Sequence, residues 1–350
     1  MNFEKEIKNL INNHKYREAL ALFEDIEMND CLLFLLRGDL KYELSNFEDA
    51  ISDYTSAIEI DNKNPKYYNN RGNALGNIGR IDEALADYNK AIELNPNYAE
   101  AYFNRGLLNY NIKNMQASID DYNKAIEINP NNFMAYNNRG NVQNYLKNFE
   151  DAISDFDKAI EINSNYNTYF NRGMAKENIE DYEGSVKDYN KALEINPNDS
   201  QIYKKRAYAF YKLNKIDNAI KDYQKSYELD DTDVETLVNI GALQRKQNND
   251  LEAIKTLNKA MELDENYPDI YINRAISACR LEDYELSLQD LEKMFTLDIF
   301  RNDYISTLNT LLDEIKDKDT DKIQDYVEKV NHYLEIVSDE NFKKDKKANK

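Results

Sequence analysis

The sequence predicts an all-α protein built from a row of similar helical hairpins, and three observations support this prediction. The sequence repeats itself about every 34 residues. Apolar residues recur with helical spacing, as in Ala84, Leu85, Tyr88, Ala91 and Ile92, and no sustained period-two alternation occurs. All five prolines fall at or next to junctions between repeats, where proline can begin or end a helix without breaking one.

Two small residues in each repeat predict its two helices. The first small residue recurs 34 residues apart with one step of 33, at Gly38, Gly72, Gly106, Gly140, Gly173, Ala207, Gly241 and Ala275. The second follows twelve residues later, at Ala50, Ala84, Ser118, Ala152, Ser185, Ala219, Ala253 and Ser287. Small residues on both helices allow the helices to cross closely, so each repeat is expected to be a tight hairpin.

The segment that begins at residue 101, AYFNRGLLNYNIKNMQASIDDYNKAIEINPNN, resembles a tetratricopeptide repeat. The resemblance rests on Tyr102, Gly106, Ser118, Ala125 and Pro130, and the pattern recurs eight times over residues 31–301. It implies an α-solenoid, a right-handed superhelix whose first helices line a concave groove and whose second helices form the convex face.

The two ends of the chain depart from the pattern. Residues 1–30 resemble a divergent N-terminal repeat. Residues 302–337 are expected to form two amphipathic capping helices, around residues 304–315 and 323–337. Residues 338–350 form a charged tail with five lysines that is expected to be flexible.

Paired substitutions suggest an ion pair inside each hairpin. The residue before the first small residue is Arg37, Arg71, Arg105, Arg139, Arg172, Arg206, Ile240 and Arg274. Sixteen residues later the sequence has Asp53, Asp87, Asp121, Asp155, Asp188, Asp222, Thr256 and Asp290, so the seventh repeat loses both charges together. We expect structural Arg–Asp pairs, because a single lost partner would leave a buried charge uncompensated. The alternative is that the arginines face a ligand in the groove.

Aromatic residues are expected to fill the core between the helices. The first helices contribute Tyr68, Tyr102, Tyr136, Tyr169, Tyr203 and Tyr271, and the second helices contribute Tyr54, Tyr88, Tyr122, Phe156, Tyr189 and Tyr223.

Composition argues against several classes of function. A net charge of -20 opposes nucleic-acid binding, and no apolar run is long enough to span a membrane. The two histidines, His14 and His332, and the two cysteines, Cys31 and Cys279, lie far apart in the sequence, so no metal, cofactor or catalytic constellation is recognisable. The charged first ten residues lack a secretory signal pattern, and we expect a cytoplasmic protein that is not an enzyme.

A row of asparagines is expected to follow the groove. The positions that precede the arginines carry Asn70, Asn104, Asn138, Asn171, Asn239 and Asn273, with Lys205 in the same register, and Asn73 and Asn141 lie one turn on. An asparagine side chain can satisfy both the N–H and the C=O of an extended peptide. The alternative is that asparagine is merely frequent in this chain, although its low helix propensity favours a role.

The later repeats add positive charge to the predicted groove. Its site residues there are Lys204, Lys205, Tyr208, Lys212, Arg245, Lys246 and Arg280. In an acidic protein such a patch would favour an acidic peptide, although a scatter of solvated lysines is the alternative.

These patterns favour a non-enzymatic scaffold or adaptor that binds an extended peptide or disordered segment of a partner protein. The carboxylate clamp of chaperone-binding members of the family is not reproduced here, because Asn137 and Gln201 occupy its lysine positions. We expect a monomer. The alternative is a structural subunit that associates with itself through the ends or edges of the solenoid.

Overall fold

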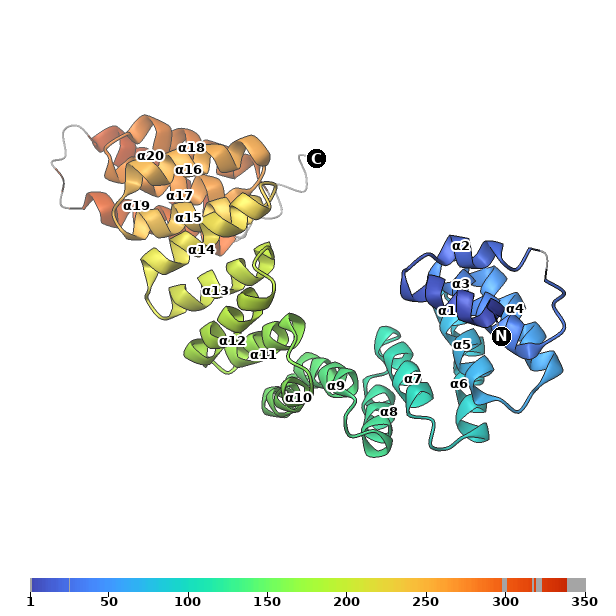
Figure 1. Ribbon diagram of the computed structural model, residues 1–350. Helices are drawn as coiled ribbons and strands as arrows, with labels where there is room; N and C mark the ends of the chain where they lie inside the picture. Colours follow the sequence, from blue (N-terminus) through green and yellow to red (C-terminus); the bar gives the residue numbers. More distant parts are fainter. Residues whose placement is uncertain (1, 25, 298–300, 317, 319–322, 339–350) are drawn as a thin grey trace. The chain divides into compact units, whose positions relative to one another are not determined.

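The structure is a computed structural model that describes residues 2–24, 26–297, 301–316, 318 and 323–338 (Figure 1). In these ranges every regular element is a helix, so the prediction of an all-α fold is confirmed. The chain divides into two compact units, unit 1 (residues 1–179) and unit 2 (residues 180–350). The boundary falls inside the fifth repeat of the sequence pattern.

Unit 1 is a series of antiparallel hairpins, in which each helix packs against the next. Its helices are α1 (Asn2–Asn12), α2 (Tyr16–Ala21), α3 (Cys31–Glu43), α4 (Phe47–Ile60), α5 (Pro65–Asn77), α6 (Ile81–Leu94), α7 (Ala99–Asn111), α8 (Met115–Ile128), α9 (Phe133–Tyr145), α10 (Phe149–Ile162) and α11 (Tyr166–Asn178). The first helices of neighbouring repeats also touch, as α5 does with α3 and α7.

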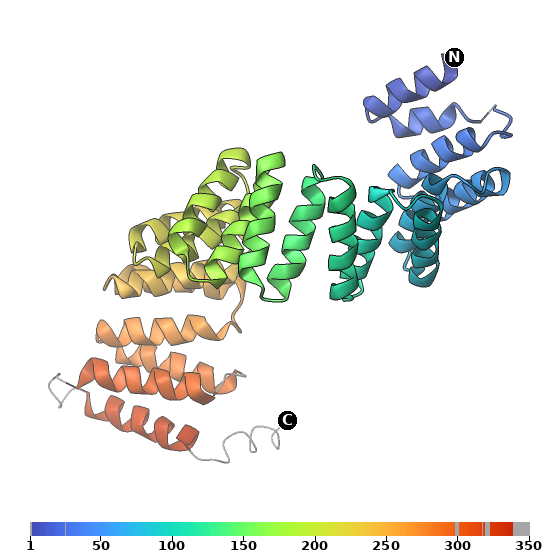
Figure 2. The ribbon, with the colours of Figure 1, turned by 90° about the horizontal axis from the view of Figure 1, so that it is seen from below.

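Unit 2 continues the same hairpin arrangement and ends in two further helices. Its helices are α12 (Tyr182–Ile195), α13 (Ser200–Lys212), α14 (Ile216–Leu229), α15 (Val234–Lys246), α16 (Asp250–Leu263), α17 (Pro268–Arg280), α18 (Tyr284–Thr296), α19 (Arg301–Ile315) and α20 (Gln324–Ser338). The two helices expected after residue 301 are therefore present as α19 and α20. The orange and red helices α17 to α20 lie next to one another in Figure 2.

The helix ends follow from local sequence. The side chain of Asn64 accepts a hydrogen bond from the backbone N–H of Lys66. Pro65 is the first residue of α5, where a backbone N–H would have no acceptor within the helix, so the missing N–H of proline costs no hydrogen bond. The tight turns inside the hairpins place one residue in the left-handed region, such as Lys113 with φ 64° between α7 and α8. That turn is closed by a hydrogen bond from the N–H of Asn114 to the carbonyl of Asn109.

The small residues of the first helices allow close contact with the second helices. The Cα of Gly140 faces the Phe156 ring so closely that an added Cβ would lie 2.8 Å from its Cε1 atom. Gly38 meets Tyr54 in the same way, at 2.7 Å. Phe156 and Tyr54 are almost completely buried. The close helix crossing predicted from the repeated small residues is confirmed in these hairpins.

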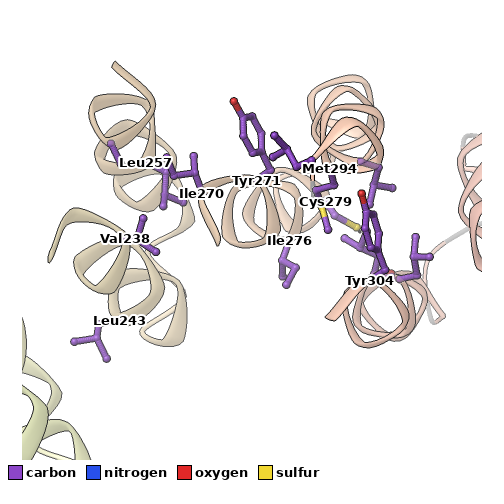
Figure 3. Close-up of a cluster of buried hydrophobic side chains, with 14 of the residues drawn as sticks. Val238, Leu243, Leu257, Ile270, Tyr271, Ile276, Cys279, Met294 and Tyr304 are labelled. Atoms are coloured by element: carbon purple, nitrogen blue, oxygen red, sulfur yellow. Dashed lines mark hydrogen bonds between the residues drawn. The ribbon is translucent and has the colours of Figure 1, made fainter. Parts of the chain in front are cut away.

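The core of unit 2 extends from α13 to α20 as one cluster of apolar side chains. Figure 3 shows Cys279, Met294 and Tyr304, contributed by α17, α18 and α19, close together in this cluster. The hydroxyl groups of Ser287 and Tyr326 lie 2.8 Å apart and connect α18 to α20. The last helices thus cover the apolar face that the last hairpin would otherwise expose.

None of the helices in the described ranges has both the length and the hydropathy that a bilayer crossing requires. Residues 339–350, which contain the five lysines of the predicted tail, lie outside the described residues.

Candidate functional site

The Arg and Asp residues that recur sixteen residues apart form an ion pair, the clasp, inside six of the hairpins that the structure describes. Arg139 on α9 donates from Nε to Oδ2 of Asp155 at 2.8 Å and from Nη2 to Oδ1 at 2.5 Å. Its Nη1 donates at 2.6 Å to Asn123 of the preceding repeat, and its guanidinium carbon lies 5.6 Å from the centroid of the Tyr136 ring. Because Asp155 is buried, this arginine provides its compensating charge.

The same Arg–Asp pair recurs in both units. Its members are Arg37–Asp53, Arg71–Asp87, Arg105–Asp121, Arg206–Asp222 and Arg274–Asp290. In the seventh repeat, Thr256 donates to Gln244 at 2.8 Å instead. The structural interpretation of these arginines is confirmed, and the alternative that they face a ligand is wrong for these pairs.

The first-helix aromatics differ from the expectation of a fully buried core. Tyr68 and Tyr271 are buried, but Tyr102, Tyr136, Tyr169 and Tyr203 are only half-buried. Each of these rings lies under the arginine three residues later, as with Arg105 at 5.6 Å from the Tyr102 centroid. A cation over the ring face is a favourable contact, so these tyrosines support the clasp instead of filling the centre of the core.

The asparagine row of unit 1 connects neighbouring repeats. Asn70 donates to the Asp39 carboxylate at 2.8 Å, and Asn104 donates to Asn69 at 3.0 Å. Asn171 donates to Asn137 at 3.5 Å. The row therefore serves partly to hold first helices together, a role that the sequence analysis did not foresee.

Other asparagine side chains of unit 1 do not donate to a neighbouring repeat. Asn73 accepts a hydrogen bond from the Tyr88 hydroxyl at 2.7 Å through its side-chain oxygen. In the fourth repeat, Asn141 and Phe156 occupy the positions of Asn73 and Tyr88. Because Phe156 has no hydroxyl, the side chain of the half-buried Asn141 has no hydrogen-bond partner among the described residues. Asn138 accepts from Asn137 at 3.3 Å.

The predicted site residues of unit 2 fall into two groups. Asn273 is buried and bonds internally, since it donates to the Asp269 carbonyl at 2.8 Å and accepts from Arg245 at 3.3 Å. Lys204, expected among the cations available to a ligand, is held at 2.8 Å by Asp233 and at 2.5 Å by Glu235. The expectation that Asn273 and Lys204 are available for a ligand is corrected, because both are occupied by partners within the chain.

Two other lysines predicted for the site, Lys205 and Lys212, lie on α13 outside the hollow that Arg245 lines. Lys205 is half-buried. Lys212 is exposed, and its ammonium lies 5.4 Å from the Tyr208 ring centroid and 5.9 Å from that of Tyr182.

Five predicted site residues meet in one hollow of unit 2, the basic hollow. It has a volume of about 410 Å³, and its lining residues are Tyr208, Tyr211, Tyr223, Asn239, Ala242, Leu243, Arg245, Lys246, Asn248 and Arg280. All of them except Tyr223 and Asn248 belong to the first helices α13, α15 and α17. Five residues that the sequence predicted for the groove thus line a single hollow, and three of them, Arg245, Lys246 and Arg280, carry positive charge.

Arg245 is the most unusual cation of the basic hollow. It has no ion-pair partner among the described residues, and its Nη groups have no hydrogen-bond partner there. Burial, and then the positive charge of Arg280, lower the pKa of the Arg245 guanidinium. Arg280 itself pairs with Glu314 at 2.6 Å and donates to the Arg245 carbonyl at 3.0 Å. Asp250 and Glu314 act in the opposite direction on this pKa, but neither forms an ion pair with Arg245. Arg245 is thus a partly buried cation without an ion pair among the described residues.

A second hollow, in unit 1, has the opposite charge. This acidic hollow has a volume of about 390 Å³ and is lined by Ile11, Tyr16, Asp39, Leu40, Tyr42, Glu43, Tyr54, Lys66, Asn70, Asn73 and Glu100. The Tyr54 hydroxyl donates to Asp39 at 2.9 Å. Burial raises the pKa of the Asp39 carboxyl.

Several lining residues of the basic hollow were not among the predicted site residues. Tyr211 could have been found, because it lies three residues after Tyr208 and so shares its helix face. Asn248 lies in the turn after α15 with φ 59°, and its position depends on the turn geometry alone.

Comparison with known families identifies the repeats. Models described as TPR repeat match residues 38–79 and 77–113, and models described as tetratricopeptide repeat match residues 99–132, 133–166, 166–199, 200–233 and 234–267. This chain belongs to the tetratricopeptide repeat family. The matched residues cover most of the hairpins of both units, including α13 and α15 of the basic hollow.

Two solved tetratricopeptide repeat (TPR) proteins share the fold. The C-terminal part of a TPR repeat-containing protein from Cytophaga hutchinsonii is 18% identical, with a TM-score of 0.57, 67% of this chain covered and 97% of that chain covered. A tetratricopeptide repeat protein from Parabacteroides merdae is 20% identical, with a TM-score of 0.50 and coverages of 71% and 98%. The MamA protein is 29% identical, with a TM-score of 0.42 and coverages of 47% and 90%. No curated protein matches the sequence.

Proposed function

We propose that this TPR protein is a non-enzymatic scaffold that binds an extended, acidic segment of a partner protein along its first helices. The observation that carries the proposal is the partly buried Arg245, whose guanidinium forms no ion pair with a described residue and donates only from Nε, to Asn273. An unpaired charge removed from water is costly, and an anionic ligand would remove that cost.

The chemistry of the basic hollow supports a peptide ligand. Tyr208 and Tyr211 offer rings with exposed fractions of 39% and 37%, so apolar side chains of a ligand can pack on them. Asn239 lines the same hollow and its side chain has no hydrogen-bond partner among the described residues, which leaves the side-chain amide for a peptide backbone. Repeat arrays of this kind bind partners through extended surfaces of this type.

The asparagines have a more limited role in the proposal than the sequence suggested. Asn141 in unit 1 and Asn239 in unit 2 are the members that we expect to hold peptide backbone. Asn70, Asn104 and Asn171 donate to neighbouring repeats. The side-chain oxygen of Asn70 also accepts from Asn69 at 3.1 Å, so the side-chain oxygens of Asn104 and Asn171 are the ones that we expect to accept a peptide N–H.

The proposal is tested with three fluorescent peptide libraries of equal length that differ only in being rich in Asp and Glu, in Asn and Gln, or in Lys and Arg. Fluorescence anisotropy with the full chain is expected to show the acidic library binding about tenfold more tightly than the neutral one, with weakening as salt rises. The Arg245→Gln variant is expected to lose this preference.

Lys259→Ala is the matched control, because Lys259 is an exposed cation on α16 outside the basic hollow. It is expected to bind like the wild type. Equal binding of all three libraries by the wild type, or loss of the acidic preference in Lys259→Ala to the same degree as in Arg245→Gln, would contradict the proposal.

A further inference from the structure

Two cations of the basic hollow, Arg245 and Lys246, form no ion pair of their own within the part of the chain that the structure describes. Arg280 is paired with Glu314 at 2.6 Å and lies 3.9 Å from Asp250. Arg245 and Lys246 have no acidic partner within ion-pair distance among the described residues. The Lys246 ammonium instead lies 4.8 Å from the centroid of the Tyr211 ring. Two cations therefore face one hollow without ion pairs of their own, while Asp250 and Glu314 offset part of the positive potential at Arg245.

Arg245 is also held in an orientation suited to an anion. Its Nε donates to Asn273 at 3.3 Å, and the carbonyl of its own residue accepts from Arg280 at 3.0 Å. The bond from Nε holds one edge of the guanidinium and leaves both Nη groups for a ligand. Two parallel N–H donors of an arginine match two oxygens of a carboxylate or a phosphoryl group.

The other residues that line the basic hollow determine the size and polarity of the ligand group that it can hold. Tyr208, Tyr211, Tyr223 and Leu243 give the hollow an apolar side, and the Asn239 amide adds a donor. A volume of about 410 Å³ is in the range of small-molecule sites and accepts a whole modified side chain.

We propose that the basic hollow binds a phosphorylated side chain of the partner segment, an inference that rests on the proposed function. At neutral pH a phosphorylated side chain carries about 1.5 to 2 negative charges and three strong acceptor oxygens. Its three oxygens match the two Nη groups of Arg245 and the ammonium of Lys246, whereas an Asp or Glu side chain provides only two oxygens. Arg245 contacts two phosphoryl oxygens, Lys246 contacts the third, and the tyrosine rings contact the side chain that bears the group.

The test uses libraries with identical acidic flanks and a central serine, glutamate, phosphoserine or phosphotyrosine. Anisotropy titrations with the full chain are expected to give the phosphorylated libraries about tenfold tighter binding than the glutamate library. The two phosphorylated libraries distinguish an aliphatic from an aromatic carrier of the group. Arg245→Gln and Lys246→Ala are each expected to lower the affinity for the phosphorylated libraries to the affinity for the glutamate library. Lys259→Ala is expected to leave all the affinities unchanged.

The outcomes separate this inference from the proposed function. If phosphorylated and glutamate libraries bind equally well to the wild type, the phosphate inference is wrong and the acidic-segment proposal stands. If no library binds, both are wrong. Because Arg245 bonds to α17 and its replacement could affect folding, the exposed Lys246 provides the second variant. A phosphate preference that survives in Lys246→Ala and in a helical Arg245→Gln would also overturn the assignment.

Discussion

Breaking the clasp of the fourth repeat should expose a strong coupling between Arg139 and Asp155. Their two hydrogen bonds measure 2.8 and 2.5 Å, and the exposed fractions of the two side chains are 22% and 8%. Arg139→Ala leaves the buried Asp155 carboxylate uncompensated, and we expect a loss of about 3 to 5 kcal/mol in the free energy of unfolding. Asp155→Ala should cost about 1 to 3 kcal/mol, because Arg139 keeps Asn123 and the Tyr136 ring.

The assay is a double-mutant cycle by urea unfolding, followed by circular dichroism, on the wild type, both single variants and the double variant. Removing both partners should cost less than the sum of the single losses, with a coupling energy of about 1.5 to 3 kcal/mol. The exposed pair of Lys158 and Glu161, 2.8 Å apart, serves as the control and should show a coupling below about 1 kcal/mol. If the loss of unfolding free energy in the double variant equals the sum of the two single losses to within about 0.5 kcal/mol, Arg139 and Asp155 are not coupled and the clasp is refuted.

Three further predictions test the packing, the electrostatics and the association state. Gly140→Val should lower the free energy of unfolding by about 1 to 3 kcal/mol, because its Cβ would lie 2.8 Å from the Phe156 ring. Gly76→Ala, whose Cβ would meet only a Leu108 methyl at 3.7 Å, should raise it by about 0.4 to 1 kcal/mol in the same urea titration. Burial raises the pKa of Asp39, so the folded chain holds this proton more tightly than the unfolded chain and loses stability as pH rises through the folded pKa. Asp39→Asn should therefore gain melting temperature relative to the wild type between about pH 4 and pH 7, and a constant difference would contradict this sign. Light scattering after size exclusion should give a monomer mass at micromolar concentration, and a concentration-dependent dimer would favour the self-associating structural subunit.

The period of the sequence predicted the helices and their pairing well, because both depend on short-range rules. A small residue at Gly38 and an aromatic residue at Tyr54 must meet if two helices cross closely, and they do. The seventh repeat has Ile240 and Thr256 where the other repeats have Arg and Asp, which identified these positions as a pair. A buried charge without its partner is costly, so both charges are lost together.

The site was less predictable, because side-chain partners in neighbouring repeats cannot be deduced from one repeat. Lys204 is neutralised by Asp233, which lies 29 residues later and also caps α15. Asn64 likewise caps a helix, which accounts for part of the asparagine content without any ligand. The charge of a groove position therefore depends on long-range contacts that the repeat pattern does not encode.

The central claim is that the first helices of unit 2 hold an acidic peptide, and hydrogen–deuterium exchange with mass spectrometry tests it most directly. The wild-type chain is compared with and without the acidic library at saturating concentration. We predict slower exchange in α13, α15 and α17, whose residues line the basic hollow, and unchanged exchange in α16 and α18. Protection confined to α16 and α18, or to unit 1, would contradict the claim.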